Sequence, residues 1–419
     1  MNLQEFRKAG HWPSLLCAFL YFDISFMVWV LIGALSNVIA AEFKLSPEQK
    51  GFLVAVPILG GSILRLVLGW MTDLIGARKT GLIGLGLTLV PLLLGWIWAD
   101  SYWTLLFVGL LLGVAGASFA AALPLASRWY PPQYQGLAMG IAGAGNSGTA
   151  LATFFAPMLA LSLGWQGVFG LALIPVLLTL IVFALFAKDS DKQPAPKSLG
   201  DYFAILKHAD TWWFNLFYSV TFGGFVGFAS YLSVFFHDHY GLEAVQAGRF
   251  VTLCVISGSF LRPVGGYLAD KLGGIRLLSM LYCGIGVAML GVATLPPLLL
   301  GTTLLFLAMG MLGMGNGAVF QLVPQRFSKE IGIVTGIVGA AGGLGGFLLP
   351  NVFGILKGKL ESFSYGFVVF GTVAFACTGL LAYVATQWQG KFVSRSGLAT
   401  GVEKEEPIAE PALPQTASV

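Results

Sequence analysis

The chain has 419 residues, of which 57% are hydrophobic and only 10% are charged, with 56 glycines and 33 phenylalanines. This composition lies far outside that of water-soluble domains and predicts an integral membrane protein. The net charge of +4 comes from short segments between apolar stretches and forms no basic face, so nucleic-acid binding has no support.

Apolar stretches of about 18 residues or more are candidate spanning helices, because about 20 residues at 1.5 Å rise cross the hydrocarbon core. The sequence has twelve such stretches, and we predict an all-α membrane protein with twelve transmembrane helices. The predicted spans are 14–40, 51–74, 80–98, 103–126, 136–160, 165–187, 211–236, 246–271, 275–296, 298–322, 332–356 and 363–386.

The segment before the first span, "MNLQEFRKAGHW", leads into apolar sequence without a small-residue cleavage site, so we expect a retained first helix and no signal peptide. Twelve spans place both termini on one side of the membrane. That side carries 16 Lys and Arg residues, and the opposite side carries five. Because cytoplasmic loops are enriched in Lys and Arg, we expect both termini in the cytoplasm, in a multi-pass protein of the inner membrane.

An internal repeat organises the chain. "GSILRLVLGWMTDLIG" from Gly61 and "GSFLRPVGGYLADKLG" from Gly258 agree at 8 of 16 positions with a shift of 197 residues. The repeat predicts two six-helix bundles related by pseudo-twofold symmetry, which is a transporter architecture. The predicted parts are an N-terminal bundle at 1–187, a cytoplasmic linker at 188–210, a C-terminal bundle at 211–386 and a disordered cytoplasmic tail at 387–419.

The four cysteines lie in four different apolar segments without a CxxC spacing, so we expect small core residues and neither disulfides nor a metal site. They are Cys17, Cys254, Cys283 and Cys377.

Two arginines lie within predicted spans at matched positions of the repeat. Arg65 and Arg262 should therefore face each other near the middle of the bilayer. An arginine there costs about 2.5 to 3.5 kcal/mol on insertion scales and cannot escape by deprotonation. Each arginine can instead pair with a carboxylate or extend to the interface, but Asp23 is the single acid well inside a span. One carboxylate cannot neutralise two guanidinium groups, so a bound anion is the favoured counter-charge.

Glycine-rich segments accompany the arginines. "GIAGAGNSGTA" from Gly140 and "GIVGAAGGLGGFLLP" from Gly336 predict close helix packing, which leaves room only for a small anion. Although "GAGNSG" matches G-x-G-x-x-G, no strand precedes it, so a dinucleotide site is excluded. Asn146 places a carboxamide in the first of these segments. It can donate a hydrogen bond to an oxyanion, or it can contribute only to helix packing.

A charged turn follows each arginine-bearing helix. "GWMTDLIGARK" from Gly69 recurs as "GYLADKLGGIR" from Gly266. The charged residues Asp73, Arg78, Asp270 and Arg276 fit a cytoplasmic gate, an ion pair between helices that breaks and reforms as the halves rock. A well-capped loop explains the same residues equally well.

These motifs resemble known transporters. "GxxxDxxGxRK" is similar to the loop signature of the major facilitator superfamily. The arginine pair, "GAGNSGTA", "GAAGGLGGFLLP", "GMGNGAVFQLVP" and "FYSVTFGGFVGF" together resemble the nitrate/nitrite porter family over nearly the whole chain.

The resemblance implies a substrate site and its residues. Arg65 and Arg262 would bind nitrate or nitrite between them, Asn146 would donate to it, and Tyr218 would supply a hydroxyl. The remaining implied residues are the apolar walls Phe119 and Phe222 and the signature glycines Gly145, Gly342 and Gly343. The second glycine signature lacks a counterpart of Asn146, so the contacts need not be symmetric.

Nitrate is too weak a base to carry a proton, so coupling to protons would need a protein group. Asp23, in "LYFDISFMVW", is the candidate, although a permanent salt bridge explains it equally well. Import of one negative charge against an inside-negative potential of about 100 mV costs about 2.3 kcal/mol. We therefore expect nitrate/proton symport, with electroneutral nitrate/nitrite exchange as the alternative.

Other classes of function fit less well. A sensor would need an output domain, which the short polar tail does not supply. An anion channel is harder to separate from a transporter by sequence. No nucleophile with a base or metal constellation lies in the spans, so we expect no enzyme, no cofactor and no metal, and a monomer in the lipid bilayer.

Overall fold

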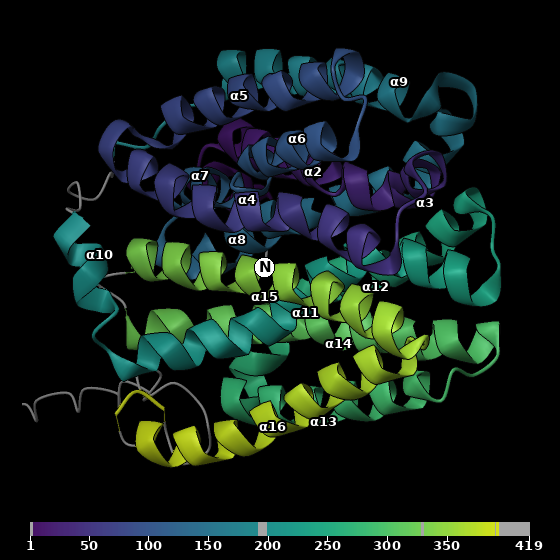
Figure 1. Ribbon diagram of the computed structural model, residues 1–419. Helices are drawn as coiled ribbons and strands as arrows, with labels where there is room; N and C mark the ends of the chain where they lie inside the picture. The colour runs from purple at the N-terminus through teal and green to yellow at the C-terminus, as the bar shows by residue number, and fades with distance from the viewer. Residues whose placement is uncertain (1–2, 192–198, 328–330, 390, 394–419) are drawn as a thin grey trace, which may run out of the picture.

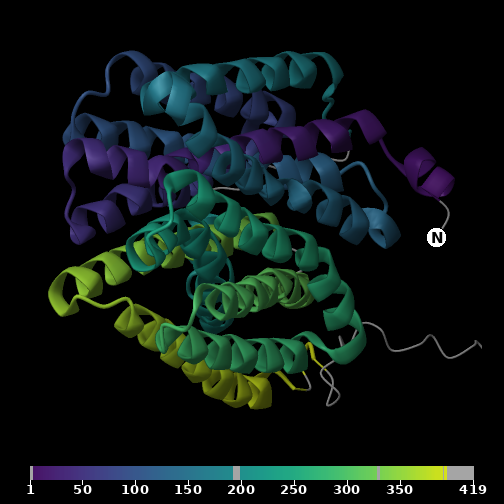
Figure 2. The ribbon, with the colours of Figure 1, turned by 90° about the vertical axis from the view of Figure 1, so that its right-hand side faces the viewer.

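The computed structural model describes residues 3–191, 199–327, 331–389 and 391–393. Its helices form two bundles that lie side by side, with the N-terminal half above the C-terminal half in both ribbon views (Figures 1 and 2). The two halves meet where α4 packs along α15, α9 along α12 and α3 along α11.

The N-terminal half contains nine helices in the described part of the chain. They are α1 (Leu3–Ala9), α2 (Trp12–Trp29), α3 (Leu31–Phe43), α4 (Pro47–Ile75), α5 (Ala77–Ile97), α6 (Tyr102–Gly116), α7 (Phe119–Ser127), α8 (Pro132–Gly143) and α9 (Gly148–Phe186), with the short 3₁₀ helix η1 (Ala144–Ser147) before α9.

The described part of the C-terminal half follows a short connecting helix, α10 (Leu199–Ile205), which lies at one end of the bundles (Figure 1). The helices of the C-terminal half are α11 (Ala209–Tyr240), α12 (Ala244–Leu272), α13 (Gly274–Ala293), α14 (Leu298–Arg326), α15 (Ile331–Leu360) and α16 (Ser364–Trp388).

Eleven stretches in the described residues are long and apolar enough to cross a membrane. One of them, Ala138–Phe186, has 49 residues, which is far more than the roughly 20 that one crossing needs. Gly164 breaks it with φ 68° and ψ 166°, between the predicted spans 136–160 and 165–187. The all-α fold with twelve crossings predicted from the sequence is therefore confirmed.

Glycine turns connect the arginine-bearing helices to the helices that follow them. Gly76 between α4 and α5 has φ 92°, and Gly273 between α12 and α13 has φ 87°. Residues with a Cβ atom are strained at these positive φ values, so glycine permits the turn. The two turns are 197 residues apart, the shift of the sequence repeat.

Large apolar side chains cover the outside of the bundles, as a lipid-facing surface requires. Leu299 is 81% exposed, Leu161 77% and Trp103 75%. Cys283 is also exposed, so the expectation of four core cysteines is wrong at this position because its helix face points outward.

The C-terminal boundary also differs from the sequence prediction. Residues 387–393 were expected in a disordered tail, but α16 continues to Trp388, which is fully buried against Phe214. Phe392 and Val393 are buried as well, because apolar side chains here pack back onto the bundle. Residues 394–419 lie outside the described residues.

Candidate anion-binding site

Arg65 lies in the middle of α4 and its side chain is fully buried. Its Nη1 donates to the Gly339 carbonyl of α15 at 2.7 Å, and its Nη2 donates to the Gly116 carbonyl of α6 at 2.8 Å. The Nε has no partner among the described residues. Arg65 therefore bridges the two halves by hydrogen bonds to backbone carbonyls, and its Nε–H remains available.

Three aromatic rings surround the Arg65 guanidinium. Its Cζ lies 5.0 Å from the ring centroid of Phe222, 5.2 Å from that of Phe119 and 5.7 Å from that of Trp29. Ring faces attract a desolvated cation by about 2 kcal/mol or more. They carry no net charge, however, so the positive charge of Arg65 is not neutralised by them.

Arg262 occupies the matched position in α12 and is 9% exposed. Its Nη2 lies 3.5 Å from the Tyr218 hydroxyl, at the limit of a hydrogen bond, and its Nη1 has no partner among the described residues. Its Cζ lies 5.7 Å from the Phe119 ring centroid. Both guanidinium groups thus contact the same ring, and the structure brings the two predicted arginines together.

Neither arginine is paired with a carboxylate in the described residues. The ion pairs found there are Lys50–Asp238, Arg128–Asp73 and Arg326–Asp210. Asp23 instead accepts a 2.8 Å hydrogen bond from the Ser147 hydroxyl and a hydrogen bond from the Gly148 amide. Two buried cations therefore lie on the same aromatic ring without an acidic partner among the described residues, an arrangement that a bound anion would stabilise.

Asn146 lies in η1, where the chain changes from α8 to α9. Its side chain is fully buried, and neither carboxamide atom has a hydrogen-bond partner among the described residues. A methyl group at the nearby Gly143 would lie 4.0 Å from the Arg262 Nε. This 3₁₀ segment therefore sits beside the second arginine with an unused donor.

Tyr218 and Phe222 form one wall of the site from α11. Their rings stack at a centroid distance of 5.1 Å, and the Tyr218 ring also meets Phe320 edge-on at 4.8 Å. Gly342 of α15 packs on this wall, since a methyl group there would lie 2.5 Å from the Tyr218 ring. The small residue lets α15 approach the aromatic pair closely.

The other two predicted glycines serve helix contacts. Gly343 faces Ser62 of α4, whose hydroxyl donates to the Ala340 carbonyl across the halves. Gly145 faces the backbone of α2, where a methyl group would lie 2.9 Å from the Asp23 amide nitrogen. Gly145 therefore positions the asparagine segment by close packing.

The predicted cytoplasmic gate residues divide between different partners. Asp73 forms a 2.8 Å ion pair with Arg128, which follows α7 in the same half. Burial, and then the charge of Asp73, raise the pKa of Tyr202 in the connecting helix α10 to about 12. Arg78 donates its backbone amide to Asp189 at 2.9 Å and its side chain to the Ala184 carbonyl at 2.8 Å.

The matching residues of the second half, Asp270 and Arg276, are exposed, and neither has an ion pair in the part of the chain that the structure describes. The structure thus brings together neither Asp73 with Arg78 nor Asp270 with Arg276.

Sequence reasoning missed Trp29. Its ring faces Arg65, and its Nε1 donates to the Pro57 carbonyl at 2.7 Å. No local pattern distinguishes it from the other ten tryptophans of this apolar chain.

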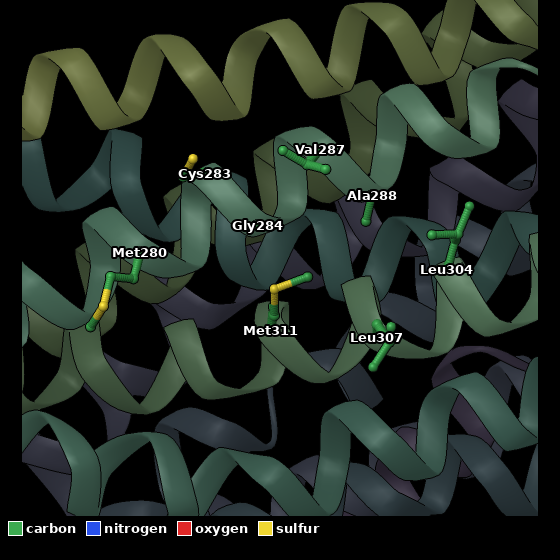
Figure 3. A pocket seen from close by; sticks show the side chains of 8 residues that line it. All are labelled: Met280, Cys283, Gly284, Val287, Ala288, Leu304, Leu307 and Met311. Carbon is green, nitrogen blue, oxygen red and sulfur yellow. The ribbon is translucent and has the colours of Figure 1, made fainter.

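An open groove of about 490 Å³ lies elsewhere, between α13 and α14 (Figure 3). It is lined by Met280, Cys283, Gly284, Val287, Ala288, Leu304, Leu307 and Met311. These side chains offer no charged or strong hydrogen-bond donor, so the groove is unsuited to an inorganic anion.

A two-bundle helical fold with a buried polar site between its halves defines a secondary transporter. The Major Facilitator Superfamily profile matches residues 17–350. Two solved transporters share the fold. The D-xylose-proton symporter has a TM-score of 0.68 at 16% identity, with 92% of this chain and 97% of that chain covered. A bacterial homolog of the human lysosomal transporter Spinster has a TM-score of 0.63 at 18% identity, with 89% and 94% covered.

Curated relatives are more similar in sequence. The nitrite extrusion protein of Bacillus subtilis strain 168 is 35% identical over 87% of this chain and 91% of its own. The probable nitrate transporter NarT of Staphylococcus carnosus is 35% identical over 88% and 94%. The probable nitrate/nitrite antiporter NarK1 of Thermus thermophilus is 34% identical over 80% and 82%. The chain belongs to the nitrate/nitrite porter family of the major facilitator superfamily.

Proposed function

We propose that the protein transports nitrate, and also nitrite, across the cytoplasmic membrane by alternating access. The observation that carries the proposal is the pair of buried guanidinium groups at Arg65 and Arg262, without a carboxylate partner among the described residues and with unpaired N–H donors. Planar guanidinium groups match the geometry of a small planar oxyanion. The named activities of the relatives support the same substrate class.

In this proposal, Arg262, Asn146 and Tyr218 supply donors to the anion, and Arg65 does so through its free Nε. Phe119 and Phe222 exclude water from it. The glycines at 145, 342 and 343 allow the helices to close around a substrate of only a few atoms. The proposed cycle opens the site to one side of the membrane at a time, and the cluster around Asp73 and Arg128 belongs to the cytoplasmic gate.

We propose nitrate/proton symport for uptake, with Asp23 as the proton carrier. Asp23 is 8% exposed, lies beside the asparagine segment through Ser147 and Gly148, and is not ion-paired with either arginine. A carboxylate in this position can gain and lose a proton without breaking the arginine pair. Nitrate/nitrite exchange is the second candidate, since one relative is named an antiporter.

We also propose that residues 1–187 and 211–386 act as the two moving bundles joined by the cytoplasmic linker 188–210. The excess of Lys and Arg on the side of the termini supports a cytoplasmic location for both ends in the inner membrane. Each chain has a complete site between its own halves, which supports a functional monomer.

Reconstituted liposomes test this function. With a proton gradient and no internal nitrite, symport predicts accumulation of nitrate above its external concentration. Exchange predicts accumulation only with internal nitrite. Nitrate flux that never exceeds the equilibrium level under either condition would indicate a channel and contradict the proposal.

A further inference from the structure

A second buried carboxamide without a hydrogen-bond partner in the described part of the chain is that of Asn316 in α14. The side chain is fully buried, and neither its Oδ1 nor its Nδ2 meets a donor or acceptor among the described residues. An unpaired buried carboxamide is destabilising, and a ligand that pairs with it would remove this cost.

The helix position of Asn316 places it on the face of α14 that carries Phe320. Phe320 lies one turn further along α14, and its ring meets the rings of Tyr218 at 4.8 Å and Phe119 at 5.8 Å. Residues four apart share one face of a helix. Asn316 therefore lies on the face of α14 that borders the site.

The two flanking glycines define its neighbours more closely. A methyl group at Gly315 would lie 2.6 Å from Thr221 of α11, and one at Gly317 would lie 2.4 Å from the backbone carbonyl oxygen of Arg262 in α12. Asn316 therefore lies on α14 next to the place where α11 and α12 meet. Those helices carry Tyr218 and Arg262, and no described residue pairs with the Nη1 of Arg262.

The internal repeat gives an independent reason for this position. In this part of the repeat the shift is 200 residues, three more than between the arginine-bearing helices; it aligns Gly113 with Gly313 and Pro124 with Pro324, and it places Asn316 opposite Gly116. The carbonyl of Gly116 accepts from Arg65. By this alignment, Asn316 corresponds to the residue whose carbonyl binds Arg65 in the first half.

We propose that Asn316 is a further substrate-binding residue, whose carboxamide donates a hydrogen bond to an oxygen of the anion beside Arg262. The inference rests on the anion transport proposed above. It supplies from α14 the counterpart of Asn146 that the glycine-rich α15 lacks, so each half contributes one arginine and one carboxamide to the anion.

Asn316→Leu tests the proposal, because leucine fills a similar volume without a donor. The purified variant is titrated with nitrate, and nitrate-dependent thermal stabilisation and counterflow in liposomes are measured. We expect the half-saturating nitrate concentration to rise by about 10-fold or more. Without nitrate, the unfolding temperature should stay equal or rise, since an unpaired amide is removed. A merely structural role predicts a lower unfolding temperature.

Asn316→Asp provides a second variant of almost the same shape, which keeps the test valid if leucine disturbs the fold. Its carboxylate repels an anion, so nitrate stabilisation should be lost. Thr302→Val is the matched control: Thr302 is buried in α14, its hydroxyl has no partner among the residues that the structure describes, and it lies fourteen residues, close to four turns, from Asn316. It should bind nitrate like the wild type.

Wild-type nitrate affinity in both Asn316 variants would overturn the inference and leave the proposed function intact. If the wild-type protein itself shows neither nitrate stabilisation nor counterflow, the proposed function fails and this inference fails with it.

Discussion

Arg65 donates to the backbone carbonyls of Gly339 and Gly116, whereas the described residues offer Arg262 only the Tyr218 hydroxyl at 3.5 Å. The two arginines are thus matched in sequence but unequal in their surroundings. Arg65 is oriented by helices of both halves, while Arg262 makes a single long hydrogen bond within the described residues. We infer that Arg65 fixes the site and that Arg262 responds to its occupancy.

Replacement of either arginine by lysine tests the need for a planar guanidinium. We expect Arg65→Lys and Arg262→Lys each to abolish nitrate uptake, because an ammonium is a point charge and cannot make the same paired contacts. Uptake in cells is compared with the amount of folded protein in the membrane. Wild-type uptake by either variant would contradict this assignment.

Asp23→Asn tests proton coupling at a residue that lies outside the arginine pair. The amide still accepts from the Ser147 hydroxyl but cannot carry a proton. We expect nitrate accumulation driven by a pH gradient to disappear while nitrate counterflow at equal pH continues. Undiminished proton-driven accumulation in vesicles would remove Asp23 from the coupling mechanism.

At the scale of elements, the contact between α4 and α15 depends on small residues. A methyl group at Gly343 would lie 2.9 Å from Ser62 Cβ, one turn from the Gly339 carbonyl that binds Arg65. Gly343→Ala should therefore separate the helices and destabilise the protein by about 1 to 3 kcal/mol. We expect a lower unfolding temperature and weaker nitrate uptake.

Gly336→Ala is the control for this prediction. Gly336 lies in the same helix, and a methyl group there would meet nothing within 4 Å. Equal effects of the two substitutions would show that helix propensity, and not the contact with α4, determines the outcome.

The elements also show what the sequence could predict. Hydropathy was sufficient for the spans, since it depends on local composition, and the 197-residue repeat anticipated the matched turns at Gly76 and Gly273. Local patterns do not reveal which distant helix a side chain meets. The Arg128 partner of Asp73 and the Trp29 ring beside Arg65 therefore became visible only in three dimensions.

The candidate site was partly predictable for the same reason. An arginine in an apolar span is conspicuous at any position, so Arg65 and Arg262 could be selected without a structure. Asn316 gives the same kind of signal in "GMGNGAVF" but was not selected, because its orientation within α14 follows from tertiary contacts. The roles of the other residues remain predictions.

At the scale of the whole molecule, the two halves are joined by polar contacts at the side opposite the termini. Lys50 of α4 forms a 2.8 Å ion pair with Asp238 of α11, and the Asn37 amide donates to the Ser233 carbonyl at 2.9 Å. The ion pair is the single one between the halves in the described residues. In the proposed alternating-access cycle, these contacts would break when the site opens to that side.

Asp238→Asn should therefore shift the population toward the state open opposite the termini. The Lys50 and Asp238 side chains are 16% and 18% exposed, and such pairs contribute about 0.2 to 1 kcal/mol, which corresponds to a shift of roughly 1.4- to 5-fold. Labelling of a cysteine placed in the proposed outward pathway measures this population. The charge-swapped double variant, Lys50→Asp with Asp238→Lys, should restore wild-type labelling; persistent excess labelling would contradict the role of this ion pair.

Equilibrium binding of nitrate to the purified protein, compared between wild type and Arg262→Gln, tests the arginine pair most directly. The two buried guanidinium groups have no acidic partner in the described residues, so we expect one nitrate bound per wild-type chain. The nitrate affinity of the variant should fall by about 10-fold or more, while the variant keeps its fold. Unchanged nitrate affinity in a folded Arg262→Gln variant would contradict the account.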